Sequence, residues 1–140
     1  SQFQPVGQAH VYVADTLGEM GVLYDLAPVA LIAGSLLPHL KGHNPIEPAK
    51  IGAAVLSGPH VESFEDVFGA LFTSGAARRV TDAQSIAAAI AELWADSACR
   101  DAQLDAARAF VSQGDAAFAE TVTALLALAA TTREAAHAPA

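Results

Sequence analysis

Short apolar runs, separated by polar and glycine-containing stretches, mark the first half of the chain. The run at 29–34 contains no polar residue, which is typical of a strand buried on both faces. Residues 10–15 and 53–57 predict two further strands, and residues 77–80 a weaker fourth. Because segments with helical start signals lie between these runs, we expect a parallel sheet with right-handed crossovers in a three-layer α/β domain.

Helix start signals follow the first two expected strands. Residues 16–19 (Thr-Leu-Gly-Glu) have the form of a capping box, in which the hydroxyl accepts from a free backbone N–H and the carboxylate reaches back. Residues 44–47 (Asn-Pro-Ile-Glu) have a related form, with Pro45 at the first helical position, where its missing N–H costs nothing. Both segments are therefore predicted to be helix N-termini.

The remaining helices occupy the second half of the chain. We expect one helix from 63 to about 74, ended by Gly75, and another that opens at 81–84. Apolar residues then recur at helical spacing, so the C-terminal third is predicted to be helical. One domain is assigned to 1–130, and a disordered tail to 131–140. A last helix is expected from 115 to about 130, with Phe118, Val122, Leu125 and Leu126 on its apolar side.

The number of strands is low for this class of domain. A doubly wound nucleotide-binding domain usually has about six strands, whereas this chain supplies about four and opens almost directly on one of them. We therefore expect the chain to lack the first strands of its sheet.

Composition narrows the class of protein. Of 140 residues, 53% are apolar and 16% are charged, so we expect one folded domain. The formal charge is -8, with seven Lys and Arg, so no nucleic-acid partner is expected. No apolar run approaches the roughly 18 residues of a membrane span, and a soluble chain is expected. Cys99 is the single cysteine, interpreted as a packing residue in a protein from a reducing compartment.

The two predicted helix N-termini form the first candidate binding site. Ligands of open α/β sheets bind beyond the carboxyl ends of the strands, and free N–H groups there can hold a phosphate even in an acidic chain. Glu19 and Glu47 have two possible roles. Each can simply complete a capping box, or it can accept hydrogen bonds from both hydroxyls of a ribose, as acidic residues do in dinucleotide folds. A turn at Gly34 and Ser35 lies beside them.

Other polar residues near this site have alternative interpretations. His39 and His43 are four residues apart, a spacing that binds zinc on a helix, but Pro38 and Gly42 argue against a helix there, and we expect no metal site. His60 either fixes a turn or donates to a ligand. Lys41 is either a solvated loop charge or a partner for a carboxylate or phosphate. Because no nucleophile elbow, P-loop or GxGxxG motif is present, a Ser or Cys nucleophile has no support.

Five stretches, taken in order, are similar to a known family. They are 15–20 (DTLGEM), 23–24 (LY), 34–35 (GS), 42–48 (GHNPIEP), and 58–60 (GPH) followed by Phe64. Together they resemble the C-terminal half of bacterial 3-deoxy-D-manno-octulosonic acid (Kdo) transferases over roughly residues 10–115. The central motif, an asparagine and a glutamate framed by prolines, is far more specific than a single glycine-rich turn.

The resemblance implies the C-terminal half of a GT-B glycosyltransferase with two Rossmann-like domains. This half would hold the CMP-Kdo donor, and an N-terminal domain would hold the lipid A precursor. Family members are inverting and metal-independent, and they act in lipopolysaccharide biosynthesis at the cytoplasmic face of the Gram-negative inner membrane. No cofactor is therefore expected. Their general base is a glutamate of the N-terminal domain, so this chain alone is expected to be inactive.

The resemblance also implies the binding residues. By position, CMP contacts fall on Leu17, Gly18, Glu19, Asn44, Pro45, Ile46 and Glu47, which coincide with the two predicted helix starts. A possible donor loop comprises Gly34, Ser35, Lys41, Gly42, His43 and His60.

The chain departs from the family in two ways. Family members carry two glycines before the histidine, whereas Lys41 and Gly42 stand here, in a loop one residue longer. A basic motif that also contacts CMP precedes the part represented here, so weak donor affinity is expected.

Two other functions remain open. The chain could belong to another GT-B nucleotide-sugar transferase or to an epimerase that uses a UDP donor. It could also be a non-catalytic module, because a sheet without its opening strands has an unpaired edge that favours self-association.

Overall fold

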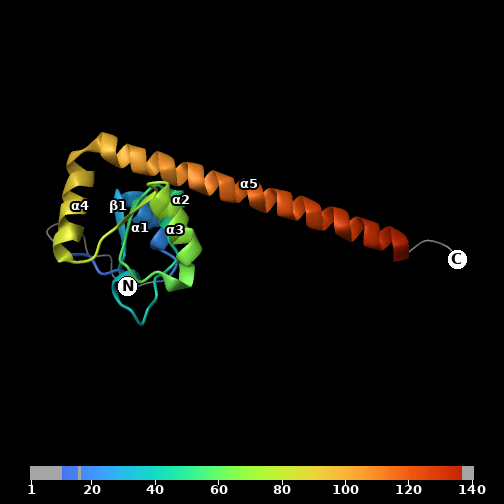
Figure 1. Cartoon of the computed structure of the whole chain (residues 1–140), viewed down its shortest axis with the longest axis horizontal. Helices are drawn as coiled ribbons and strands as arrows, with labels where there is room; N and C mark the ends of the chain where they lie inside the picture. Colours follow the sequence, from blue (N-terminus) through green and yellow to red (C-terminus); the bar gives the residue numbers. More distant parts are fainter. Residues whose placement is uncertain (1–10, 16, 137–140) are drawn as a thin grey trace, which may run out of the picture.

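A parallel sheet forms the centre of the domain (Figure 1). The computed structural model describes residues 11–15 and 17–136. Within them, three strands lie in the order β1 (Val29–Ile32), β2 (Ala54–Ser57) and β3 (Ala77–Arg79). Ile32 pairs with Ser57, and Ser57 pairs with Arg79, so the strands end at the same level. Their carboxyl ends therefore form one edge of the sheet, from which the loops of the candidate site start.

Helices cover both faces of the sheet, which confirms the three-layer α/β class. On one face, α2 (Ile46–Ile51), α3 (Glu65–Thr73) and the start of α5 (Ser97–Ala136) pack around Val55, Phe68 and Leu71. On the other face, α4 (Ala83–Ala95) packs against Leu56 and Val80. Val55 and Leu56 are neighbours that point to opposite faces, so an unbroken apolar run was the correct signal for a doubly covered strand.

The ends of two predicted strands differ in the structure. The run at 29–34 leaves the sheet at Ile32, because a 3-10 turn, η1 (Ala33–Leu36), begins there. The strand predicted at 10–15 was wrong for residues 11–15, which are exposed and irregular, while residue 10 lies outside the described residues. A strand needs a neighbouring strand to satisfy its backbone groups, and the described residues place none beside 11–15.

The helices predicted at 63–74 and from 81 are present as α3 and α4, each starting two residues later than predicted. A 3-10 turn, η2 (Glu62–Phe64), leads into α3, and Gly75 ends it with φ 75°, while Ala76 N–H donates to Leu71 O at 2.8 Å. The helix predicted at 81–84 begins at Ala83. Its capping box joins Asp82 and Ser85, one residue later than the Thr81 signal.

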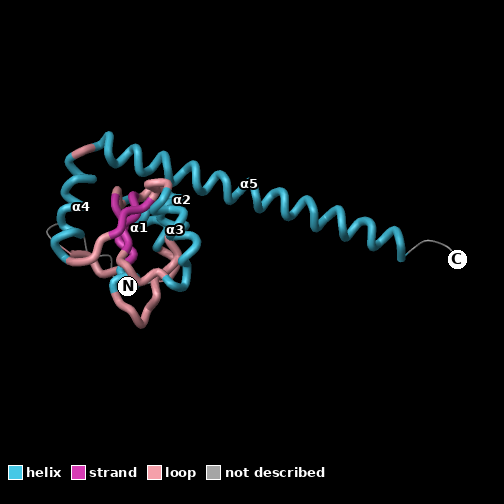
Figure 2. Tube along the Cα trace, viewed as in Figure 1, coloured by secondary structure: helices cyan, strands magenta, loops and turns pink. Residues whose placement is uncertain are grey.

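The C-terminal third is helical, as predicted, but the last helix is not separate. A single helix, α5, runs for 40 residues from Ser97 to Ala136 and passes through Gly114 without a break. Figures 1 and 2 show its distal half extending well beyond the rest of the domain. The tail predicted at 131–140 stays a prediction, since the helix reaches Ala136 and 137–140 lie outside the described residues.

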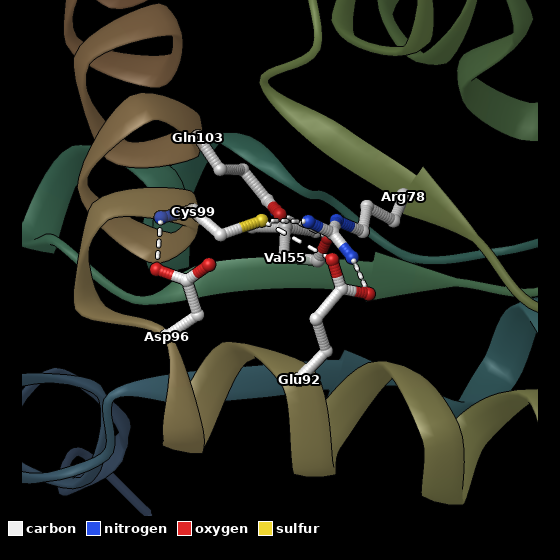
Figure 3. A network of polar contacts seen from close by, with 6 residues as sticks. All are labelled: Val55, Arg78, Glu92, Asp96, Cys99 and Gln103. Atoms are coloured by element: carbon white, nitrogen blue, oxygen red, sulfur yellow. Dashed lines mark hydrogen bonds and ion pairs between the residues drawn. The ribbon is translucent and has the colours of Figure 1, made fainter.

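Polar side chains fasten the start of α5 to the sheet (Figure 3). Gln103 is buried, and its Nε2 donates to Val55 O at 2.9 Å and to Ala76 O at 3.4 Å. Beside it, the Arg78 guanidinium forms an ion pair with Glu92 at 2.8 Å. Cys99 Sγ accepts from Arg78 and donates to Glu92, so this residue takes part in a polar contact that its interpretation as a packing residue did not include. The Arg78 side chain is thus buried for the most part.

Candidate functional site

The loops after β1 and β2 are joined at the carboxyl edge of the sheet. Ser35 is fully buried, and its Oγ donates to Ile32 O while accepting the Gly58 N–H at 2.6 Å. The His60 N–H donates to Ser35 O at 2.9 Å. These bonds explain the GS and GPH stretches: a small hydroxyl side chain holds the turn at 58–60 in place.

Close packing at this edge requires two glycines. A Cβ atom on Gly58 would lie 2.6 Å from the carbonyl carbon of Ser35 and 2.8 Å from the backbone nitrogen of Leu36. A Cβ atom on Gly34 would overlap the His43 ring. His43 therefore lies against the turn after β1, and the sequence-predicted residues Gly34, Ser35 and His43 are brought together.

The loop that carries Lys41 and Gly42 folds onto the turn after β2. Both residues have positive φ, 55° and 84°, and Lys41 O accepts the Ser63 N–H at 3.0 Å. The α-carbon of Gly42 is so close to this turn that an added Cβ would lie 3.1 Å from His60 O. Lys41 is a non-glycine residue in the left-handed region, which is uncommon and consistent with a loop of altered length. Its side chain is exposed.

His60 fixes a turn in this structure, as one of its two predicted roles requires. Its backbone N–H donates to Ser35 O, and its ring Nδ1 lies 3.7 Å from Glu62 Oε1. The ring is 31% exposed. A donor role toward a ligand stays a prediction.

The motif at 44–47 begins a helix, as predicted from the residues alone. Asn44 Oδ1 accepts the Ile46 N–H at 2.9 Å, which satisfies one of the free N–H groups of the first turn. The helix itself begins at Ile46, with Pro45 as its N-cap, one residue later than expected. Pro45 and Pro48 are buried and anchor the segment, whereas Asn44 and Glu47 are exposed at its start. The polar side chains of Asn44 and Glu47 are therefore exposed to solvent on a segment that the two buried prolines hold in place.

The segment at 17–19 precedes a helix, as predicted, but Glu19 does not occupy the position in the first turn that the prediction gave it. Helix α1 (Met20–Leu26) has Glu19 as its N-cap, without a side-chain cap, and Thr16 lies outside the described residues. Gly18 has φ 90°, a left-handed conformation that a right-handed helix cannot include, so the helix starts only after it. Leu17 is fully exposed. Glu19 therefore stands before the helix rather than in its first turn.

Tyr24 is a residue near this site for which sequence reasoning proposed no role. Burial raises the pKa of Tyr24, and the charge of Glu47 raises that pKa further. Helices α1 and α2 are neighbours, since a Cβ on Gly21 would lie 3.8 Å from Ile51 Cδ1. Gly21 and Tyr24 are three residues apart and so lie on the same side of α1, a spacing that could have signalled a shared contact with α2.

The described residues contain neither a cluster of metal ligands nor a membrane-spanning helix. Among the described residues, no group of three or more His, Cys, Asp and Glu side chains is placed to hold a metal ion. No helix of the described ranges combines the length and apolar character that a membrane span requires. The exposed side chains at the start of α2 are those of Asn44 and Glu47.

Comparison with known proteins identifies the relatives of the chain. No protein-family model matches it. Over 122 residues, 87% of the chain, it is 37% identical to the 3-deoxy-D-manno-octulosonic acid transferase of Bordetella pertussis. The chain is a homologue of the Kdo transferases. A probable mitochondrial Kdo transferase of Arabidopsis thaliana is 47% identical over 64 residues, 46% of the chain.

A solved structure places the similarity within the Kdo transferases. The C-terminal CMP-Kdo binding domain of WaaA from Acinetobacter baumannii superposes with a TM-score of 0.71 at 25% identity, covering 76% of this chain and 57% of that one. The matched segments span only 28% of the Bordetella pertussis protein and 14% of the Arabidopsis thaliana protein. The chain thus corresponds to the C-terminal part of a Kdo transferase.

Proposed function

We propose that this chain is the donor-binding domain of a Kdo transferase and that the full enzyme transfers Kdo from CMP-Kdo to a lipid A precursor. The similarity to a CMP-Kdo binding domain supports the proposal most directly. The arrangement of the loops agrees with it, because the turns at 34–35 and 58–60 and the motif at 44–47 start from one edge of the sheet. We place the domain at residues 1–130.

Donor binding would use the start of α2. Asn44 shapes the turn by accepting the Ile46 N–H. Glu47, the residue after Ile46, is exposed, and its carboxylate can accept hydrogen bonds from both ribose hydroxyls. Ile46 would contact the nucleotide, with the buried Pro45 holding it in position, and the exposed Leu17 with Gly18 and Glu19 would approach from the segment before α1. The chain is strongly acidic, so local N–H donors rather than net charge would hold the phosphate.

The reaction itself needs groups from the rest of the protein. In the inverting mechanism, a glutamate of the N-terminal acceptor domain deprotonates an acceptor hydroxyl, which attacks the anomeric carbon of Kdo as CMP leaves. The residues of this chain would bind and orient the donor and supply no proton transfer. The isolated chain is therefore expected to be inactive, and the full enzyme is expected to act at the cytoplasmic face of the inner membrane.

Replacement of Glu47 tests the proposal. In the full-length enzyme, Glu47→Ala removes a carboxylate that accepts two hydrogen bonds, which corresponds to roughly a 10- to 100-fold weaker affinity for CMP. Because Glu47 is exposed, the melting temperature should not change. The exposed Glu120→Ala on α5 is the matched control and should leave CMP binding unchanged.

Calorimetric titration with CMP and with UDP measures both affinity and base preference. Unaltered CMP affinity in Glu47→Ala would contradict the assigned role of Glu47. Tighter binding of UDP than of CMP would instead assign the chain to another nucleotide-sugar transferase or to an epimerase.

A further inference from the structure

Lys41 is fixed by its backbone at the carboxyl edge of the sheet. It lies in the loop between η1 and α2, and its carbonyl oxygen accepts the Ser63 N–H of η2 at 3.0 Å. The next residue, Gly42, is buried, and a Cβ added to it would lie 3.3 Å from the Cα of Val61. The Lys41 side chain, in contrast, is exposed. The two loops therefore hold the base of this side chain in place and leave the rest of it open to a ligand.

The backbone conformation of Lys41 is uncommon for a lysine. Its φ of 55° lies in the left-handed region, which glycine enters more easily than any residue with a Cβ. A strained residue persists where its surroundings fix it, and such positions cluster at functional sites. A lysine at this place therefore suggests that its side chain contributes something that glycine cannot.

The other described cations have partners within the chain. Lys50 pairs with Asp115 at 3.2 Å, and Arg79, at the carboxyl end of β3, lies over the Phe72 ring with its Cζ 4.6 Å from the centroid. The remaining three bind Glu92 (Arg78), Asp105 (Arg108) and Leu93 O (Arg100). Within the described ranges, the Lys41 ammonium group makes no ion pair. A cation at this edge is therefore open to an anion from outside the chain.

We propose that, in the donor-binding role proposed above, on which this assignment rests, the Lys41 ammonium group binds the phosphate of the nucleotide. Lysine offers three donors and no acceptor, and it binds phosphate as a point charge. The hydroxyls of ribose both donate and accept, whereas the phosphate oxygens only accept and carry the charge. Lys41 also precedes Asn44 by three residues and Glu47 by six, so it belongs to the same loop as the residues assigned to the nucleotide.

The charge of the chain gives this one lysine a large effect. The formal charge is -8, which repels an approaching phosphate at long range. Backbone N–H groups donate hydrogen bonds but carry no net charge. A cation in contact with the phosphate acts well within the screening length of about 8 Å at physiological ionic strength, so Lys41 offsets the repulsion where the phosphate lies.

Calorimetric titration of the full-length enzyme with CMP, and with cytidine, which lacks the phosphate, tests the contact. Lys41→Gln should weaken CMP binding roughly 3- to 10-fold, the range between an exposed ion pair and a charge-assisted hydrogen bond, and should leave cytidine binding unchanged. In about 1 M NaCl, where the screening length falls to roughly 3 Å, the loss should shrink to less than about twofold. Lys41→Arg keeps the charge and should keep most of the CMP affinity.

Lys50→Gln is the matched control. It removes the same charge from the last turn of α2, where Lys50 pairs with Asp115 of α5. This variant should bind CMP like the unaltered enzyme, because its charge lies away from the carboxyl edge. Equal far-UV circular dichroism of the two glutamine variants checks that both are folded.

Four results would overturn the contact. Unchanged CMP affinity in Lys41→Gln would do so and leave the proposed function standing. An equal loss for CMP and cytidine, or an equal loss in Lys50→Gln, would show that the effect depends neither on the phosphate nor on this position. A rise in the KM for CMP-Kdo without a loss of CMP affinity would assign Lys41 to the carboxylate of the sugar instead. An unaltered enzyme that binds no CMP would overturn the proposed function, and this contact with it.

Discussion

Gly58 is the residue on which the packing of the candidate site depends most. It is buried, and its N–H donates to the fully buried Ser35 Oγ at 2.6 Å. In Gly58→Ala, the new Cβ would meet the Ser35 carbonyl oxygen, the Ser35 carbonyl carbon at 2.6 Å and the Leu36 nitrogen at 2.8 Å. These are backbone atoms, so no side-chain rotation can relieve the overlap, and the two turns must separate.

The expected loss of stability is about 3 kcal/mol. Overpacking of a close-packed site costs roughly 1 to 3 kcal/mol, and the bonds from Gly58 and His60 to Ser35 contribute about 1 kcal/mol each. Urea unfolding of the chain, followed by far-UV circular dichroism, measures the change in the free energy of unfolding. The midpoint should fall while the slope with urea stays constant, because the surface exposed on unfolding is the same.

Gly69→Ala is the matched control. Gly69 lies inside α3, and a Cβ there would meet no atom within 4 Å. The same chemical change should therefore stabilise the chain by roughly 0.5 to 1 kcal/mol. If Gly58→Ala destabilised the chain by less than about 1 kcal/mol, the loops would be able to move apart freely, and the argument for a fixed junction at Ser35 would be refuted.

Two further predictions concern the start of α5. Gln103→Ala leaves the carbonyls of Val55 and Ala76 without this donor and should cost about 2 to 3 kcal/mol in urea unfolding, whereas the exposed Gln113→Ala should be nearly neutral. The hydrogen bond from Arg78, followed by that from Cys99, holds the pKa of Glu92 below its usual 4.5. The ionised Glu92 therefore contributes stability at pH values above 4.5, and this contribution is lost as the pH falls through the pKa of the folded state. Glu92→Gln should therefore lower stability at pH 7 and flatten its decline between about pH 5 and pH 3, and an unchanged acid profile would contradict the pairing.

Local signals in the sequence were sufficient where the structure depends on near neighbours. The apolar run at 53–57 became β2, since few conformations other than a covered strand suit such a run, and the weaker signal at 77–80 became β3. Gly75 ended α3 as predicted, because the left-handed turn it adopts is a property of the residue itself. Asn44 accepted a backbone N–H of α2, which requires only residues two positions apart.

Predictions failed where a residue depends on a distant partner or on a neighbour's conformation. The apolar residues at 11–15 lack a strand beside them within the described residues and stay irregular. The sequence signal at 77–80 is local and does not show that Arg78 pairs with Glu92 of α4 and lies beside Cys99 of α5. The last helix was predicted to begin at 115, but α5 continues through Gly114, because a single glycine costs only about 1 kcal/mol within a long helix.

The sequence by itself determined the class of the domain, the order of β1, β2 and β3 with the helices between them, and the family to which its central motif is related. These properties rest on side-chain periodicity, on glycine and proline at fixed positions, and on a specific short motif. Only the tertiary structure decided that Ser35 joins two turns and that Gln103 fastens α5 to the sheet. Such contacts link residues up to 48 positions apart, and chain folding rather than local preference brings them together.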